Sequence, residues 1–248
     1  MHRSASRLTR ILACAAVPVM LVVAGCSSDE SDSKGDADAS SASPSAEPSA
    51  TVPPAKYSGL PDVCKTIGGK TIGSLVPKVK VKGGTASKST DVTSRSRCSW
   101  NGLDDNGVKG SQYRWLDVSL MRYDSDASLG SGAARAGEYY TKEIASARGT
   151  EGAKDVKTAA ASGIGDQATT VTYTLKKTGE DFAYATVVAR TENVVVTLTY
   201  NGTGYAGAKS PGVGEMSEGA VKAAKEAVTA IADGAGQVPT AEDTPKAS

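Results

Sequence analysis

The chain has 248 residues, and its 28 basic and 27 acidic side chains give a formal charge of +1, which excludes a strongly basic nucleic-acid-binding protein. Its one histidine is His2, in an N-terminal segment that we expect to be removed. The mature protein would then have no histidine, which excludes Ser-His-Asp and Cys-His catalysis and most zinc or copper sites. We therefore predict a protein that is not an enzyme and has no metal site and no cofactor.

Residues 1–25 have the features of a lipoprotein signal peptide. Three arginines and no acid precede an apolar run at 11–23, which is too short for a comfortable membrane span. Small residues then lead to Cys26, whose thiol would receive the diacylglyceryl group. The alternative is an ordinary signal peptide followed by a chance cysteine. We predict cleavage before Cys26 and a lipid anchor at the extracytoplasmic face of the cell membrane.

Two cysteines remain for the folded part of the chain, Cys64 and Cys98, because Cys14 leaves with the signal peptide and Cys26 carries lipid. An even pair in an oxidising compartment predicts a disulfide. Closing a loop of that size would stabilise the fold by roughly 3–4 kcal/mol on the chain-entropy account. The alternative is a pair of free buried thiols.

Composition divides the rest of the chain into three parts. Residues 26–56 are rich in Ser, Ala, Asp, Glu and Pro and carry a formal charge of −4. This composition predicts a disordered acidic tether spanning about 30 Å. Residues 57–236 have the length of one domain. Residues 237–248 are predicted to form a disordered tail.

The first part of the domain is predicted to contain a helix that begins at Pro61, with a second short turn at 71–76. A short strand is predicted at 97–100, and the Asn-Gly pair at 101–102 predicts a chain reversal after it. The acidic loop at 104–107 resembles half of a calcium site, but its spacing is wrong for an EF-hand and favours a plain hairpin turn.

The segment 113–123 alternates in the manner of a half-buried strand, with Leu116, Val118 and Leu120 on one side. The opposite side carries aromatic and sulfur-containing side chains. Three of these form a candidate ligand-binding strip: Trp115, Met121 and Tyr123. The alternative, which we favour, is that the strip is core beneath a helix.

A helix is predicted at 131–148, and a last helix at 215–232 after a glycine-rich loop at 202–214. The tight loop at 163–166 lacks the spacing and the lysine of a phosphate loop. Three strands linked by hairpins are predicted at 169–177, 182–190 and 194–200. A second candidate surface is a polar sheet face formed by Thr170, Thr172, Thr174, Thr197 and Thr199. The predicted fold class is α+β: an antiparallel sheet of about five strands with two or three packed helices.

Four features resemble a known family: Cys64 in the first helix, Cys98-x-Trp100, the Gly-Ile-Gly-Asp-Gln-Ala segment at 163–168, and the closing strand NVVVTLTY. Together they resemble the actinobacterial lipoproteins that carry domain of unknown function 3558. The resemblance implies a lipobox, a disulfide and a PsbP-like α+β domain without a catalytic set. Such proteins belong to the cell envelope, and some have partners in the cell wall. The Gly68-Gly69 pair departs from the Leu-rich helix expected there.

These observations favour a non-enzymatic envelope lipoprotein that binds a small ligand, a glycan or a partner protein. Its expected partners are the membrane, through the lipid anchor, and an unknown ligand or envelope protein, but not nucleic acid. One alternative is an accessory or sensor subunit of a membrane complex. A less favoured alternative is a hydrolase that uses a pair of carboxylates, drawn from Asp104, Asp105, Asp124, Asp126, Glu138 and Asp166.

Overall fold

The structure is a computed structural model that describes residues 51–234. The predicted signal peptide, Cys26, the tether up to residue 50 and the tail at 237–248 lie outside the described residues. In the described part, contacts with the domain begin before residue 57, because the backbone carbonyl of Pro53 accepts a hydrogen bond of 2.6 Å from the Ser125 hydroxyl.

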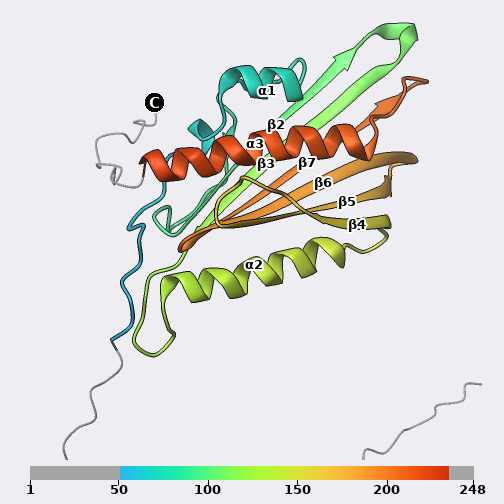
Figure 1. Ribbon diagram of the computed structural model, residues 1–248. Helices are drawn as coiled ribbons and strands as arrows, with labels where there is room; N and C mark the ends of the chain where they lie inside the picture. The colour runs from blue at the N-terminus through green and yellow to red at the C-terminus, as the bar shows by residue number, and fades with distance from the viewer. Residues whose placement is uncertain (1–50, 235–248) are drawn as a thin grey trace, which may run out of the picture. The chain divides into compact units, whose positions relative to one another are not determined.

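Seven antiparallel strands form one sheet in the order β1-β2-β3-β7-β6-β5-β4 (Figure 1). The strands are β1 (Thr85–Ala86), β2 (Arg95–Asp105), β3 (Ser111–Arg122), β4 (Lys154–Ala160), β5 (Gln167–Lys177), β6 (Glu180–Thr191) and β7 (Val194–Tyr205). The predicted α+β class is confirmed. The sheet has two strands more than predicted, β1 and β4, which are its two edges.

Helices cover both faces of the sheet, as Figure 1 shows. The first face carries α3 (Val213–Gly234), together with α1 (Gly69–Leu75) and the 3-10 turn η1 (Val63–Lys65). The second face carries α2 (Gly132–Arg148). A further 3-10 turn, η2 (Gly107–Lys109), closes the β2–β3 hairpin. We call these two surfaces the α3 face and the α2 face.

The main core lies between the sheet and helix α3. Leu116, Val118 and Leu198 point into it and are fully buried. The helix presents mostly alanines to the sheet, so that the two layers approach closely, and Gly219 lies so near the Tyr200 ring that an added Cβ would be 2.8 Å from it. The alternation predicted for segment 113–123 therefore selects the core face of β3 correctly.

The predicted helix at Pro61 is wrong in extent, because the chain makes only the short turn η1 there. The predicted disulfide is confirmed: Cys64 in η1 is bonded to Cys98 in β2, with their Cα atoms 5.3 Å apart. The Gly68-Gly69 pair starts α1, where the backbone N–H of Gly68 donates to the Glu226 carboxylate of α3 at 2.9 Å. A carboxylate on α3 thus caps α1 where no side chain of α1 itself does so.

Two predicted loops prove to be strand. Gly102 lies inside β2 rather than at a reversal, and an added Cβ would come within 2.2 Å of the Pro77 carbonyl. The chain instead reverses between Asn106 and Gly110. Likewise β7 continues through Gly202 and Gly204, where the neighbouring backbone leaves no room for a side chain. These glycines permit close approach and do not mark turns.

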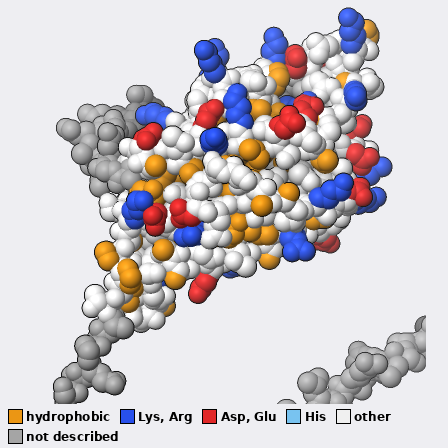
Figure 2. Space-filling model, viewed as in Figure 1, with side chains coloured by type: hydrophobic (Ala, Val, Ile, Leu, Met, Phe, Trp, Pro, Cys, Tyr) orange, Lys and Arg blue, Asp and Glu red, His pale blue; other side chains and the backbone are white. Residues whose placement is uncertain are grey.

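Strand β4 forms one edge of the sheet, and every residue in it is exposed. Lys154 and Lys157 flank an irregularity in its pairing with β5. Charge and a bulge on an edge strand oppose pairing with another chain. Figure 2 views this side of the molecule, where hydrophobic side chains gather between α3 and α2.

Candidate functional site

A groove opens on the α2 face, between α2 and the β2 side of the sheet. Helix α2 packs over the other side, where its Ala136 and Tyr140 contact Val188 and Val195. The uncovered part encloses a volume of about 570 Å³. It is lined by side chains of β2, β3, β7 and α2 and by the loop at 87–90. Seven Ser and Thr residues contribute to the lining: Ser87, Ser89, Thr90, Ser96, Ser119, Thr197 and Thr199.

An ion pair with one buried partner forms part of the groove wall. The Arg97 Nε donates to both carboxylate oxygens of Asp117, at 3.0 and 2.7 Å. The Asp117 side chain is 10% exposed, whereas that of Arg97 is 55% exposed. Burial raises the pKa of Asp117, and the Arg97 guanidinium opposes the rise. The buried carboxylate thus orients a guanidinium whose other end faces the groove.

Helix α2 contributes Tyr139 and Glu143 to the opposite wall. Thr197 of β7 donates its hydroxyl to the Glu143 carboxylate at 3.2 Å. Burial raises the pKa of Tyr139, and the negative charge of Glu143 raises it further. Tyr139 therefore remains a neutral phenol, able to donate or accept a hydrogen bond.

The three residues of the predicted strip are placed differently from one another. Met121 lines the groove. Tyr123 lies just beyond the end of β3, with its ring 5.8 Å from that of Tyr139 and with the Arg135 guanidinium 5.2 Å from its centroid. Trp115 lies on the α2 face of β3, paired with Asn101 and outside the groove lining. All three are half-buried, neither core nor fully exposed.

The predicted threonine-rich sheet face is wrong as a single surface. Direct pairing places Thr197 and Thr199 on the α2 face with Ser119 and Asp117. Thr170 pairs with Val187 and therefore lies on the α3 face, and so do Thr172 and Thr174. Of these five threonines, Thr197 and Thr199 line the groove and the other three do not. The sequence could not divide the threonines between faces, because the division depends on how the strands pair.

The carboxylates considered for hydrolysis are not the groove carboxylates. Asp124 pairs with Arg122, and Asp126 accepts backbone hydrogen bonds in the turn before α2. Asp166 accepts from the Glu192 backbone N–H. Asp105 accepts from the hairpin turn. The acids that line the groove are Asp117 and Glu143, neither of which was among the predicted site residues.

The sequence does contain a signal that marks Asp117 as unusual. Asp117 falls in the same alternation phase as Trp115 and Met121, and an acid in mid-strand departs from a purely apolar or aromatic strip. Nothing in the sequence identified its partner, because Arg97 lies on another strand.

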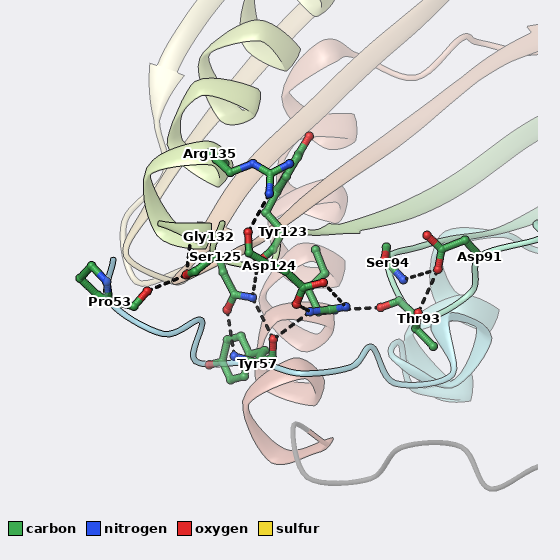
Figure 3. Close-up of polar contacts among 12 residues, drawn as sticks. Pro53, Tyr57, Asp91, Thr93, Ser94, Tyr123, Asp124, Ser125, Gly132 and Arg135 are labelled. Atoms are coloured by element: carbon green, nitrogen blue, oxygen red, sulfur yellow. Dashed lines mark hydrogen bonds and ion pairs between the residues drawn. The ribbon is translucent and has the colours of Figure 1, made fainter. Parts of the chain in front are cut away.

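A second polar cluster fixes the start of the domain (Figure 3). The Arg122 guanidinium donates to the backbone carbonyls of Tyr57 and Thr93 and pairs with Asp124. The Asn193 amide accepts from the Tyr57 N–H at 2.9 Å and donates to the Tyr57 carbonyl at 2.9 Å. Both side chains are buried. The cluster therefore holds the incoming N-terminal segment against the end of the sheet.

Among residues 51–234, no helix is long and apolar enough to cross a membrane. The same residues contain no group of three or more His, Cys, Asp or Glu side chains arranged to hold a metal ion.

No family model matches the chain, and no curated protein matches it. Among solved structures, one described as "Crystal structure of LpqN involved in cell envelope biogenesis of Mycobacterium tuberculosis" is similar to part of it. The similarity covers 48% of this chain and 71% of that chain, at 14% sequence identity and a TM-score of 0.25. At this TM-score the likeness carries no argument about function.

Proposed function

We propose that the chain is a lipid-anchored envelope protein that binds an acidic glycan in the groove beside α2, without chemical turnover. A sugar acid presents many hydroxyls and one carboxylate. The groove presents Ser, Thr and Tyr hydroxyls and one oriented guanidinium. These two sets of groups are complementary.

The observation that carries this proposal is the arrangement of Arg97. Its Nε is held by the buried Asp117 carboxylate. Within the described residues, neither terminal nitrogen of Arg97 makes a hydrogen bond, so both are free to donate to a ligand oxyanion in the bidentate manner that guanidinium favours. Arg97 is the proposed ligand-binding group, and Asp117 is a positioning residue.

The anchor and the family belong to the same proposal. The signal-like segment ending at Cys26 supports lipid attachment, and the disulfide between Cys64 and Cys98 agrees with the lipoprotein family that the sequence resembles. Two acyl chains give stable attachment, because each buried methylene contributes about 0.8 kcal/mol. We expect Cys26→Ser to release the protein or leave an uncleaved precursor. A cleaved, detergent-partitioning Cys26→Ser protein would contradict the anchor.

The ligand proposal is tested by calorimetric titration of the mature chain, carrying Cys26→Ser, with a glucuronate-containing oligosaccharide and with its neutral glucose counterpart. We expect binding of the acidic probe and at least tenfold weaker binding by Arg97→Gln, since a hydrogen bond to a charged group contributes about 1.5–3 kcal/mol. Arg148→Gln, an exposed arginine at the end of α2, is the matched control. Equal binding of both probes, or equal loss in the control, would contradict the proposal.

One observation favours a second candidate function, a carboxylate-based hydrolase. Asp117 and Glu143 line the same groove, and the pKa of Asp117 is raised. A raised pKa suits a general acid. Against this, both Asp117 oxygens are engaged by Arg97. Analysis of the titrated oligosaccharide for cleavage products separates the two functions. Cleavage that is abolished by Glu143→Gln would replace the binding proposal with the hydrolase.

A further inference from the structure

The sheet edge opposite β4 carries an unusual concentration of positive charge. Between residues 78 and 97 the chain has six basic residues and one acid, Asp91. Five of the basic side chains are exposed and, within the described residues, have no ion-pair partner. We call these five the basic edge: Lys78, Lys80, Lys82, Lys88 and Arg95.

Backbone pairing places the segment 79–87 along the outer side of β2. Val79 forms a bridge with Gly102, and the Lys80 N–H donates to the Asn101 carbonyl at 2.9 Å. β1 continues the pairing along β2, and the Ser87 N–H donates to the Arg97 carbonyl. The segment therefore follows β2 from Arg97 to Gly102, a length of roughly 20 Å. Lys80 and Lys82 are exposed on this outermost segment, Lys78 and Lys88 flank it, and Arg95 lies at the start of β2 beside it.

Two exposed apolar side chains accompany the charges. Val81 is 52% exposed and Val92 is 56% exposed, although valine is ordinarily buried. Cationic side chains interspersed with exposed apolar ones are typical of surfaces that lie in the headgroup region of a bilayer.

The basic edge also adjoins the point where the N-terminal segment enters the domain. The Arg122 Nε donates to the Thr93 carbonyl at 2.9 Å, and its Nη1 donates to the Tyr57 carbonyl (Figure 3). Thr93 lies between Lys88 and Arg95 in sequence. The buried Arg122 thus holds the start of the domain, at Tyr57, beside one end of the basic edge, at Thr93.

We propose that the basic edge docks the domain on the anionic headgroup surface of the bilayer; this inference rests on the proposed Cys26 anchor, which keeps that surface within reach. The sequence predicts a tether spanning about 30 Å, whereas electrostatic attraction is screened beyond about 8 Å at physiological salt. The tether therefore supplies proximity and the basic edge supplies contact. Lys88 and Arg95 also line the groove, so docking brings the groove mouth beside the headgroups.

A lipid surface fits better than a soluble polyanion. The mature chain has 25 basic and 27 acidic residues, a formal charge of −2, so attraction to an anionic partner depends on local concentration of charge and on proximity. The anchor would provide proximity only to the bilayer. The exposed valines, moreover, gain by burial among headgroups and gain little from a polyanion.

The test uses the full mature chain carrying Cys26→Ser, so that the lipid anchor contributes nothing to vesicle binding. If the proposed lipid anchor is wrong, the Cys26→Ser release experiment described above shows this separately. Co-sedimentation is measured with vesicles of phosphatidylcholine plus phosphatidylglycerol and with vesicles of phosphatidylcholine alone. We expect binding only to the anionic vesicles, weakening as salt is raised. The variant with Lys78→Glu, Lys80→Glu and Lys82→Glu should bind at least about 100-fold more weakly, at roughly fivefold per charge removed.

The control variant carries Lys142→Glu, Lys222→Glu and Lys225→Glu, which make the same change in net charge on exposed positions of α2 and α3. It should retain most of the binding. A second variant, Val81→Ser with Val92→Ser, should weaken binding without changing charge. Thermal unfolding verifies that each variant is folded. Three results would overturn the proposal: equal binding to both vesicles, equal loss in the control, or binding to soluble polyphosphate with none to vesicles.

Discussion

The two faces of the sheet are built from the same strands and differ in almost every property. The α3 face is closed by α3, α1 and η1 over a continuous apolar core in which Leu116, Val118 and Leu198 are fully buried. Helix α2 packs mainly on β5, β6 and β7 of the α2 face, and the open part of this face carries Arg97, Asp117 and several hydroxyls. Alternate residues of β3 thus lie on opposite faces of the sheet. Those on the closed face stabilise the fold, and those on the open face remain free to contact a ligand.

This difference indicates how the sequence can change without loss of the fold. A substitution on the α3 face changes the packing of a close-packed core, where volume matters to within one methylene. A substitution in the groove mainly changes which groups meet a ligand. For the mature chain carrying Cys26→Ser, we expect the change in the free energy of unfolding to be largest for substitutions in the closed face and smallest for those in the groove.

The largest effect is expected for Leu116→Ala on the α3 face. Leu116 is 0% exposed, and removing its side chain would lower the free energy of unfolding by about 3–5 kcal/mol, since the sheet and α3 cannot fully collapse into the cavity. Ser119→Ala, three residues further along β3 on the open face, should change it by less than about 0.5 kcal/mol. Urea denaturation measures both. Similar losses in the two variants would show that the faces are not energetically distinct.

The disulfide is the covalent part of the closed face, because it joins η1 to β2. The double variant Cys64→Ala, Cys98→Ala should lose roughly 3–4 kcal/mol by the chain-entropy account, for a sequence separation of 34 residues. Reduced wild type should be destabilised to a similar extent, which denaturation with and without a reductant would reveal. A loss confined to the alanine variant would mean that packing at Cys98 matters more than the cross-link.

The sequence predicted the closed face far better than the open one. Alternation in β3 identified its buried residues, and the cysteine count identified the disulfide. Strand β4 escaped prediction because all its residues are exposed and it has no apolar alternation. Gly102 resembled a turn residue, although its role is to let Pro77 approach. In each case the missing information was a contact with a segment distant in sequence.

The candidate site was predictable only in part, for the same reason. Met121 and Tyr123 were found from strand phase, and they lie in or beside the groove. Arg97 and Asp117 meet only because β2 pairs with β3 in one register. Glu143 reaches the groove through the packing of α2 on the sheet. Register and helix docking depend on the whole fold and cannot be obtained from local pattern.

An intermediate effect is expected where the N-terminal segment joins the sheet. Asn193→Ala removes three hydrogen bonds from a buried amide to the backbone of Tyr57 and Tyr123. It leaves buried backbone groups unpaired, at a cost of about 2 kcal/mol. Lys56→Ala, which removes the exposed pair with Glu192 and the contact of the ammonium group with the Tyr57 ring, should cost less than about 0.5 kcal/mol. Hydrogen exchange at the Tyr57 amide should accelerate in the first variant alone. Unchanged exchange there would show that Asn193 does not secure the segment.

The smallest effect is a pH dependence that distinguishes the groove from the loop at its rim. Burial raises the pKa of Asp117 above its ordinary value of 3.8, so that on raising the pH the unfolded chain loses this proton before the folded one does. Ionisation then favours unfolding, and stability falls as the pH rises from about 4 to the folded-state pKa. Asp117→Asn lacks this loss, so its stability relative to wild type should improve across that interval and then stay constant.

Hydrogen bonds from Thr93 and Ser94 lower the pKa of Asp91, so this carboxylate stabilises the fold above its unfolded pKa and loses that contribution as the pH falls. Asp91→Asn should therefore show a relative stability that worsens as the pH rises towards the unfolded pKa of about 4, in the interval just below the one in which Asp117 acts. Urea denaturation of the three proteins between about pH 3 and pH 7 measures both slopes, because every other titrating group is common to them. A zero slope for Asp117→Asn would show that Arg97 offsets the burial of Asp117 completely, and a slope of the same sign as that of Asp91→Asn would show that Arg97 lowers the pKa of Asp117 below its ordinary value.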